Sequence, residues 1–255
     1  ARPIASGWPG ASLYRSDDGG QTLAGILDVR PPGATIGSCA APLAAHPGLM
    51  IDSAGALAVS LYSGTLESVT QAAMFAGANH FAYGRDGRWE IIAAQNCVLQ
   101  GDGSWLLTNL LRGRFGTEPH GATHVEGDSI VLLDSADLGI VEVSSASIGL
   151  SRYYMAVTDG ATLDGALEEF AYRGVNLKPL SPVYLNGNRH PTTSDWSLEW
   201  LRRTRIGGDW RDKVDAELGE AGEAYEIEIY TAGHADLKRT LAASTAAATY
   251  TSAQQ

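Results

Sequence analysis

The feature that most constrains the fold is a succession of short apolar runs, each of them bounded by turn residues. The clearest pair, Trp89–Leu99 and Ser104–Leu111, flanks a Gln-Gly-Asp-Gly turn, an arrangement that predicts a β-hairpin. The chain has 30 glycines among its 255 residues, and only 18% of its residues are charged. Scarce charge, many glycines and short apolar runs together predict a mainly β protein that is rich in turns.

A second hairpin is predicted near the start, where Asp-Asp-Gly-Gly separates Ser12–Arg15 from Leu23–Val29. We expect residues 12–179 to form a β-sandwich or barrel-like module. A Pro- and Gly-rich linker at residues 1–11 precedes it, which we expect in a piece of a longer protein. Further segments typical of strands are Ala56–Leu61, His80–Tyr83, Ser129–Leu133, Ile140–Val143, Ser151–Val157 and Glu168–Tyr172.

One short helix is predicted within this module, from Leu66 to Ala76. Thr65 is a suitable N-cap, Glu67 lies in the first turn, and Gly77 occupies the position where a glycine commonly ends a helix. Apolar side chains repeat along one face at helical spacing. We therefore expect the helix to pack across a sheet.

The sequence changes character at Leu177–Val183, where two prolines bracket a short extended stretch. Beyond it, apolar and polar side chains alternate in Trp196–Trp200 and again in Tyr225–Ile229. A period of two is typical of half-buried strands. We place a domain boundary near Leu180 and expect residues 180–255 to form a β-sandwich that resembles a fibronectin type III module.

Charge is acidic overall and spread along the chain. The net charge of −11 argues against nucleic acid as a partner, since binding phosphates needs a basic face. Within the second module, Arg203 and Arg205 are expected to face Glu226 and Glu228 across neighbouring strands, each pair contributing only a few tenths of a kcal/mol.

Two further features bear on the cellular setting. Cys39 and Cys97 lie far apart in the sequence, so they form either one disulfide or two separate buried thiols. No apolar run reaches the roughly 18 residues that a membrane-spanning helix requires, so no membrane span is expected.

The segment Ser16–Thr22 nearly spells the S-x-D-x-G-x-T-W motif of sialidase-type β-propellers, with Leu23 in place of the tryptophan. In those proteins the motif is a folded turn that recurs once per blade, whereas here it occurs once. A hairpin turn whose aspartate accepts backbone N–H bonds accounts for these residues. A glycoside hydrolase or sialidase fragment is therefore the least favoured function.

The spacing of His120 and His124 would present two imidazoles to one metal if the segment were helical. Pro119, Gly121 and Gly127 indicate a loop instead, and no third ligand with suitable spacing follows. We therefore predict no metal site.

Paired carboxylates are the remaining candidates for acid–base chemistry. Asp17–Asp18 and Glu168–Glu169 are adjacent residues, which point to opposite faces of a strand, and Glu217–Glu223 lies in a Gly-rich loop. The chain also lacks nucleophile-elbow, phosphate-loop and dinucleotide-binding motifs. We therefore predict no catalytic residue and no cofactor.

Tryptophans could offer stacking platforms to sugars. Most of the six lie in alternating strands, where a core role is usual, but Trp8 and Trp210 fall in Gly-rich loops. A carbohydrate-binding module that recognises host polysaccharide is therefore kept as an alternative function.

The segment Leu110–Glu118, LLRGRFGTE, follows the predicted Ser104–Leu111 strand. Its two glycines indicate a bend or bulge, and Arg112, Arg114 and Glu118 are suited to close that bend with ion pairs. A phosphate site is the alternative, but the acidic surroundings argue against it.

This segment resembles the L-L-R-G-x-x-G-T-E signature in the C-terminal region of the large tail-tip, or baseplate, proteins of gene transfer agents and related siphophages. Other resembling segments follow in the same order, over roughly residues 7–255: GWPGASLYRSDDGG, ALAVSLYSGTLESVTQAAMFAGAN, WEIIAAQNCVLQGDGSWLLTNLL, and RRTRIGGDWRD with LGEAGEAYEIEIY.

The resemblance implies a non-enzymatic structural protein at the distal tip of a virion tail, made in the cytoplasm of the bacterial host. Its implied partners are hub and distal tail proteins, commonly in a trimer around the tail axis, with host-envelope glycan as a further contact. Candidate interface residues are Trp8, Arg112, Arg114, Glu118, His120 and Trp210.

Two departures from the family accompany the resemblance. The chain is much shorter than the large members, as a fragment or a smaller relative would be. It also ends where a fibronectin-like module still needs two strands. Such a module would have open sheet edges that some other segment must cover. We expect the missing strands to be disordered, to have been removed, or to be supplied by a partner chain.

Overall fold

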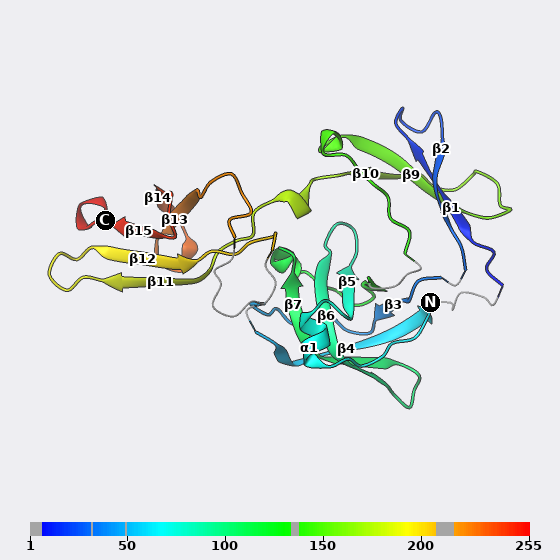
Figure 1. Ribbon diagram of the computed structural model, residues 1–255, viewed down its shortest axis with the longest axis horizontal. Helices are drawn as coiled ribbons and strands as arrows, with labels where there is room; N and C mark the ends of the chain where they lie inside the picture. Colours follow the sequence, from blue (N-terminus) through cyan, green and yellow to red (C-terminus); the bar gives the residue numbers. More distant parts are fainter. Residues whose placement is uncertain (1–6, 32, 49, 134–137, 208–216) are drawn as a thin grey trace. The chain divides into compact units, whose positions relative to one another are not determined.

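The computed structural model describes residues 7–31, 33–48, 50–133, 138–207 and 217–255. The chain divides into two compact units, Ala1–Asn176 and Leu177–Gln255, each of which is described by itself. Figure 1 shows strands throughout both units and a single short α-helix among the described residues. The mainly β class expected from the sequence is confirmed.

The first unit contains a four-stranded antiparallel sheet in the order β10-β9-β1-β2. The predicted hairpin near the start is confirmed, because β1 and β2 are antiparallel neighbours. The two central strands come from the two ends of the unit, so the remainder of the unit is inserted between β2 and β9. The strand bounds are β1 (Ala11–Ser16), β2 (Ala24–Val29), β9 (Ser151–Thr158) and β10 (Glu168–Ala171).

The inserted segment is a closed six-stranded barrel in the order β3-β4-β7-β6-β5-β8, in which β8 returns to pair with β3. Closure leaves no strand of the barrel with a free edge. The hairpin predicted around Gln-Gly-Asp-Gly is confirmed as β6–β7. The strand bounds are β3 (Ile36–Cys39), β4 (Asp52–Ser63), β5 (His80–Gly84), β6 (Glu90–Leu99), β7 (Trp105–Arg114) and β8 (Ser129–Leu132).

The barrel interior is filled by side chains that alternate along its strands. On β6, for example, Glu90, Ile92 and Ala94 are all buried. The apolar core consists of Cys39, Leu43, Leu57, Val59, Leu66, Phe81, Tyr83, Ile92, Ala94, Cys97, Leu107, Leu110 and Ile130. Glu90 shares the inward face of β6 with apolar neighbours, so a carboxylate lies inside the barrel.

Helix α1 (Gln71–Phe75) ends where the sequence predicts. Gly77 adopts a φ of 109°, and its N–H donates to the Met74 carbonyl at 3.2 Å. Glycine takes this left-handed conformation without a Cβ clash, and it can therefore end the helix.

The predicted start of this helix at Leu66 is wrong. Thr70, not Thr65, is the N-cap. The preceding residues run beside β6, where the Val69 N–H donates to the Gln95 carbonyl at 2.8 Å. Because β6 offers partners to these backbone groups, the tertiary contact overrides the local helix signal.

The strand predicted at Ile140–Val143 is absent. Both neighbours of β1 and both neighbours of β9 in the sheet are already occupied, so this segment crosses the sheet face instead. At Gly139 the backbone approaches β2 closely enough that an added Cβ would lie 2.5 Å from Leu27 Cδ2. The segment therefore covers part of that face.

The second unit is built from two small antiparallel sheets, β11-β12-β15 and β13-β14. The Trp200 and Tyr225 rings meet edge to face, with centroids 5.1 Å apart, and so join the two sheets. The predicted alternation is confirmed on β12, where Trp200 is buried while Glu199 and Leu201 are exposed. The bounds are β11 (Val183–Arg189), β12 (Trp196–Leu201), β13 (Tyr225–Tyr230), β14 (Leu237–Ala243) and β15 (Ala247–Tyr250).

The ion pairs expected between Arg203 or Arg205 and the glutamates of β13 are wrong. β12 ends at Leu201, so both arginines lie beyond the strand. Arg205 Nε pairs with Glu220 Oε1 at 2.8 Å, and Arg203 Nε donates to the Ser181 carbonyl at 2.6 Å.

Among the described residues, no helix is long and apolar enough to cross a membrane.

Candidate functional site: a buried ionic network in the barrel

The arginine of the LLRGRFGTE segment lies inside the barrel. Arg112 is 1% exposed, two residues after the inward-facing Leu110 on β7. Its Nε and Nη2 each donate to one oxygen of Glu90 at 2.8 Å, forming a bidentate pair. Its Nη1 lies 3.0 Å from the Ala44 carbonyl and 3.3 Å from Asp52 Oδ2. The guanidinium therefore joins β7 to β6 and to the start of β4.

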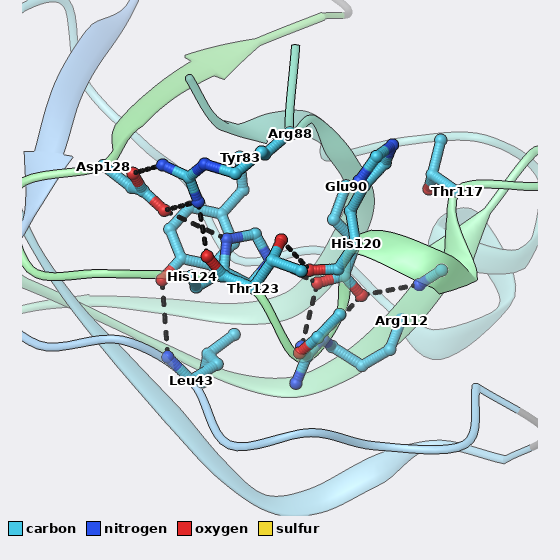
Figure 2. A network of polar contacts seen from close by, with 12 residues as sticks. Leu43, Tyr83, Arg88, Glu90, Arg112, Thr117, His120, Thr123, His124 and Asp128 are labelled. Carbon is cyan, nitrogen blue, oxygen red and sulfur yellow. Dashed lines mark hydrogen bonds and ion pairs between the residues drawn. The ribbon is translucent and has the colours of Figure 1, made fainter. Parts of the chain in front are cut away.

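Glu90 is the centre of the network shown in Figure 2. Besides Arg112, its carboxylate accepts the Gly113 N–H at 2.7 Å and His124 Nε2 at 2.8 Å. Burial by itself raises the pKa of Glu90, but the bonds from His124 and Arg112 outweigh it and hold the pKa below the usual value. Glu90 is therefore a carboxylate in the folded barrel.

His124 lies between two carboxylates, with Nε2 facing Glu90 and Nδ1 lying 3.2 Å from Asp128 Oδ2 (Figure 2). Burial raises the pKa of Asp128, and bonds from Arg88, the Val125 N–H and His124 together bring it below the usual value. Each ring nitrogen of His124 thus lies within hydrogen-bonding distance of one carboxylate.

The network pairs basic with acidic side chains. The Asp128 carboxylate also binds the Arg88 guanidinium at 3.0 Å. Three arginines, Arg85, Arg88 and Arg112, and the His124 ring thus meet three acidic side chains, Asp52, Glu90 and Asp128. Buried charges are tolerated when they are paired and hydrogen-bonded, so this arrangement holds the surrounding segments in place.

Tyr83 forms one wall of the network. Its ring stacks on His124 with centroids 3.8 Å apart and an interplanar angle of 20°. Its hydroxyl donates to Cys39 Sγ at 3.6 Å and accepts the Leu43 N–H at 3.3 Å, and burial raises its pKa. Cys39 and Cys97 are both buried free thiols, which decides between the two alternatives left open by the sequence.

The small residues of LLRGRFGTE shape the backbone around the network. Gly113 has a φ of 57°, and an added Cβ would lie 2.9 Å from the Glu118 Cα. Thr117 Oγ1 accepts the Ile91 N–H at 2.8 Å and donates to the Arg114 carbonyl at 2.7 Å. The predicted bend is present and leads into the 3₁₀ turn η1 (Glu118–His120). The LLRGRFGTE segment thus bends the chain and positions Arg112 inside the barrel.

Residues 34–131 match the family model described as Rcc01698-like, C-terminal. Rcc01698 is a tail protein associated with a gene transfer agent. The matched range begins just before β3 and ends within β8, so it coincides with the closed barrel and contains the whole ionic network. No curated protein matches the chain significantly.

Of the interface residues predicted from the sequence, Arg112 belongs to the ionic network. Arg112 was expected at an interface, but it is interior and its partners are Glu90 and Asp52. Arg114, Glu118, His120 and Trp8 are partly exposed, and their interface role stays a prediction. Trp210 lies outside the described residues.

From the sequence, His124 was predicted to be a loop histidine. In the structure it belongs to the ionic network. The described residues contain no grouping of three His, Cys, Asp or Glu side chains able to hold a metal ion. Both nitrogens of His124 are already engaged by carboxylates. One sequence signal could have indicated the network: Arg112 follows an apolar inward position by two residues, so an alternating strand places it inside, where it needs carboxylates.

The Asp-box-like segment is the folded turn that the sequence predicts. Asp18 Oδ1 accepts the Thr22 N–H at 2.9 Å, and Oδ2 accepts the Thr22 hydroxyl at 2.7 Å. Ser16 Oγ donates to Asp18 Oδ1 at 2.7 Å and accepts the Gly20 N–H at 2.8 Å. Bonds from Ser16 and Thr22 lower the pKa of Asp18 to about 2. These residues therefore serve the turn between β1 and β2.

Proposed function

We propose that this chain is a non-enzymatic structural protein of a phage-like tail tip or baseplate. The observation that carries the proposal is the match of the closed barrel to the C-terminal domain of a tail-associated family. The resemblance of LLRGRFGTE and of the flanking segments to tail-tip proteins points the same way.

The chemistry of the barrel supports a structural role. In a catalytic site, at least one acid, base or nucleophile must face the substrate. In the ionic network, Glu90 and Asp128 accept from arginine and backbone donors, and each nitrogen of His124 faces one of these two carboxylates. Such a network fixes the position of the segments that it joins, as a protein that holds partners requires.

The proposed partners are hub and distal tail proteins, arranged with this chain as a trimer around the tail axis. The proposed contacts include the partly exposed residues near the LLRGRFGTE bend, namely Arg114, Glu118 and His120. The second unit would act as a fibronectin type III-like module that presents further surface. Its β13 pairs only with β14 among the described strands, which leaves one edge of β13 available to a strand from elsewhere.

The test is immunogold electron microscopy of particles from the source culture, with antibodies raised against the full chain. Gold confined to the distal tip of tails is the expected result. Unlabelled tails, or label on cells alone, would contradict the proposal and favour the carbohydrate-binding alternative. Antibody absorbed with the purified chain is the control, since its label must disappear everywhere.

A further inference from the structure

A cavity of about 520 Å³ opens on one face of the β10-β9-β1-β2 sheet. Its size falls in the range of about 300–1,000 Å³ that small-ligand sites commonly have. Its walls are aromatic and aliphatic except for one carboxylate. Its lining includes Val141, Val143, Tyr154, Glu168, Phe170 and Tyr172.

The register of the sheet brings the aromatic rings and the carboxylate to the same face. Glu168 on β10 lies directly opposite Tyr154 on β9, and Phe170 lies two residues further along β10. The Tyr154 and Phe170 rings meet edge to face, with centroids 6.2 Å apart. The Tyr172 hydroxyl donates to Asn176 Oδ1 at 2.7 Å, which anchors that ring.

Glu168 is the one acidic side chain in the lining, which contains no basic side chain. Among the described residues, no cation lies within ion-pair distance of it. Arg15 and Arg152 are on the same face of the sheet, but both bind Asp17, at 3.0 and 3.3 Å. Phe170 is 55% exposed beside this carboxylate. The cavity thus combines aromatic faces with a carboxylate that has no counterion among the described residues.

We propose that this cavity binds an organic cation of the alkylammonium class. A cation is attracted to the faces of aromatic rings and to the carboxylate, while an apolar body packs against the aliphatic wall of Val141 and Val143. The lining does not suit a neutral sugar, which needs several hydrogen-bonding groups, or an anion, which Glu168 repels. Choline headgroups and lysine side chains both carry this chemistry.

The first experiment is isothermal titration calorimetry of the full chain with choline chloride and, separately, with Nα-acetyl-lysine methylamide. The matched probe is 3,3-dimethylbutan-1-ol, which has the shape of choline without its charge. We expect saturable binding of at least one cation and binding of the neutral probe about tenfold weaker, a difference of about 1.4 kcal/mol. Equal binding of choline and the neutral probe would overturn the proposal, as would no saturable binding of either cation.

A pair of variants on one strand identifies the site. Glu168→Gln should weaken binding of the cation about tenfold, whereas Glu169→Gln should leave it unchanged, because Glu169 points to the opposite face of β10. Phe170→Ala should also weaken binding, and thermal melts must show that each variant remains folded. Equal effects of the two glutamine variants would contradict the assignment.

The two cation probes also distinguish the sources of the ligand. Preference for choline points to a headgroup on a surface, and preference for the lysine derivative points to a side chain of a protein partner. The inference does not depend on the proposed tail-tip function, because the titrations use the purified chain. Unlabelled tails in the microscopy would leave the cavity and its test unaffected.

Discussion

The barrel and the second unit solve the problem of burying a β-sheet in opposite ways. Every strand of the barrel has two neighbours, and side chains such as Leu57, Ile92 and Leu107 are fully buried. The second unit has sheets of three and two strands, and its buried apolar residues are Trp200 and Tyr250 among those described. The inward residues of β13 are only half-buried.

The difference shows what closure makes available. In the barrel, every strand pairs with two neighbours, so the sheet encloses the interior and shields it from water. Oppositely charged side chains can then be buried together, as Arg112 and Glu90 are. In the open sandwich, the ion pair between Arg205 and Glu220 stays at the surface, where such pairs contribute about 0–1 kcal/mol. Removing a charge should therefore have very different consequences in the two units.

The largest expected effect comes from breaking the barrel network. Arg112→Ala should lower the free energy of unfolding of the barrel by about 3–5 kcal/mol, because the buried Glu90 and Asp52 carboxyl groups lose the Arg112 guanidinium. Urea denaturation measures the loss of unfolding free energy, and native-state hydrogen exchange shows which of the two units is destabilised. Exchange in β12 of the second unit should not change.

Arg15→Ala is the matched control for this variant, because the Arg15–Asp17 pair is partly exposed and its loss should cost less than about 1 kcal/mol. If Arg112→Ala leaves the barrel unfolded, Arg112→Met with Glu90→Leu and Asp52→Asn should restore folding, since it removes the guanidinium together with the two carboxylates that it binds. A similar small loss for Arg112→Ala and Arg15→Ala would show that the network does not stabilise the barrel.

The second largest effect is expected in the open sandwich. Trp200→Ala should lower the stability of the second unit by about 3 kcal/mol, since Trp200 is 6% exposed and joins the two sheets. Leu201→Ala on the outer face of the same strand should change it by less than about 0.5 kcal/mol. Hydrogen exchange in β12 and β13 provides the measurement. A loss of exchange protection in the barrel strands would mean that the two units do not respond separately.

A smaller effect is expected from the bend that positions Arg112. Gly113→Ala should destabilise the barrel by about 1–3 kcal/mol, because alanine is strained at a φ of 57° and its Cβ meets Glu118. Gly101→Ala is the control, since Gly101 lies in a turn with open space around it and no positive φ. Chemical denaturation should give a lower free energy of unfolding for Gly113→Ala than for Gly101→Ala. Equal stability would contradict a steric role for Gly113.

The smallest effect concerns the exposed carboxylate of the first turn. The pKa of Asp18 is about 2 in the folded protein, below the value of about 3.9 in an unfolded chain. Its contribution to stability is therefore present above about pH 4 and is lost as the pH falls through about 2. An NMR titration that follows the Thr22 amide should report this transition, and Asp18→Asn should abolish it. A midpoint near 3.9 would show that the turn bonds are not formed in solution.

Local signals predicted much of the fold. The β1–β2 and β6–β7 hairpins were identified because turn residues and alternation are written in neighbouring positions. The end of helix α1 was predicted because Gly77 acts through its own backbone. The start of helix α1 was predicted wrongly, because the segment before Thr70 binds β6 and the local sequence contains no sign of that contact.

The sequence by itself determined the turns, the alternation of strands and the bend of LLRGRFGTE, because each depends on residues a few positions apart. Only the tertiary structure decided which groups meet inside the barrel. The partners of Arg112 come from positions 52 and 90, and His124 approaches Glu90 from a third segment. Burial makes an unpaired charge costly, so these distant groups are brought together when the barrel closes.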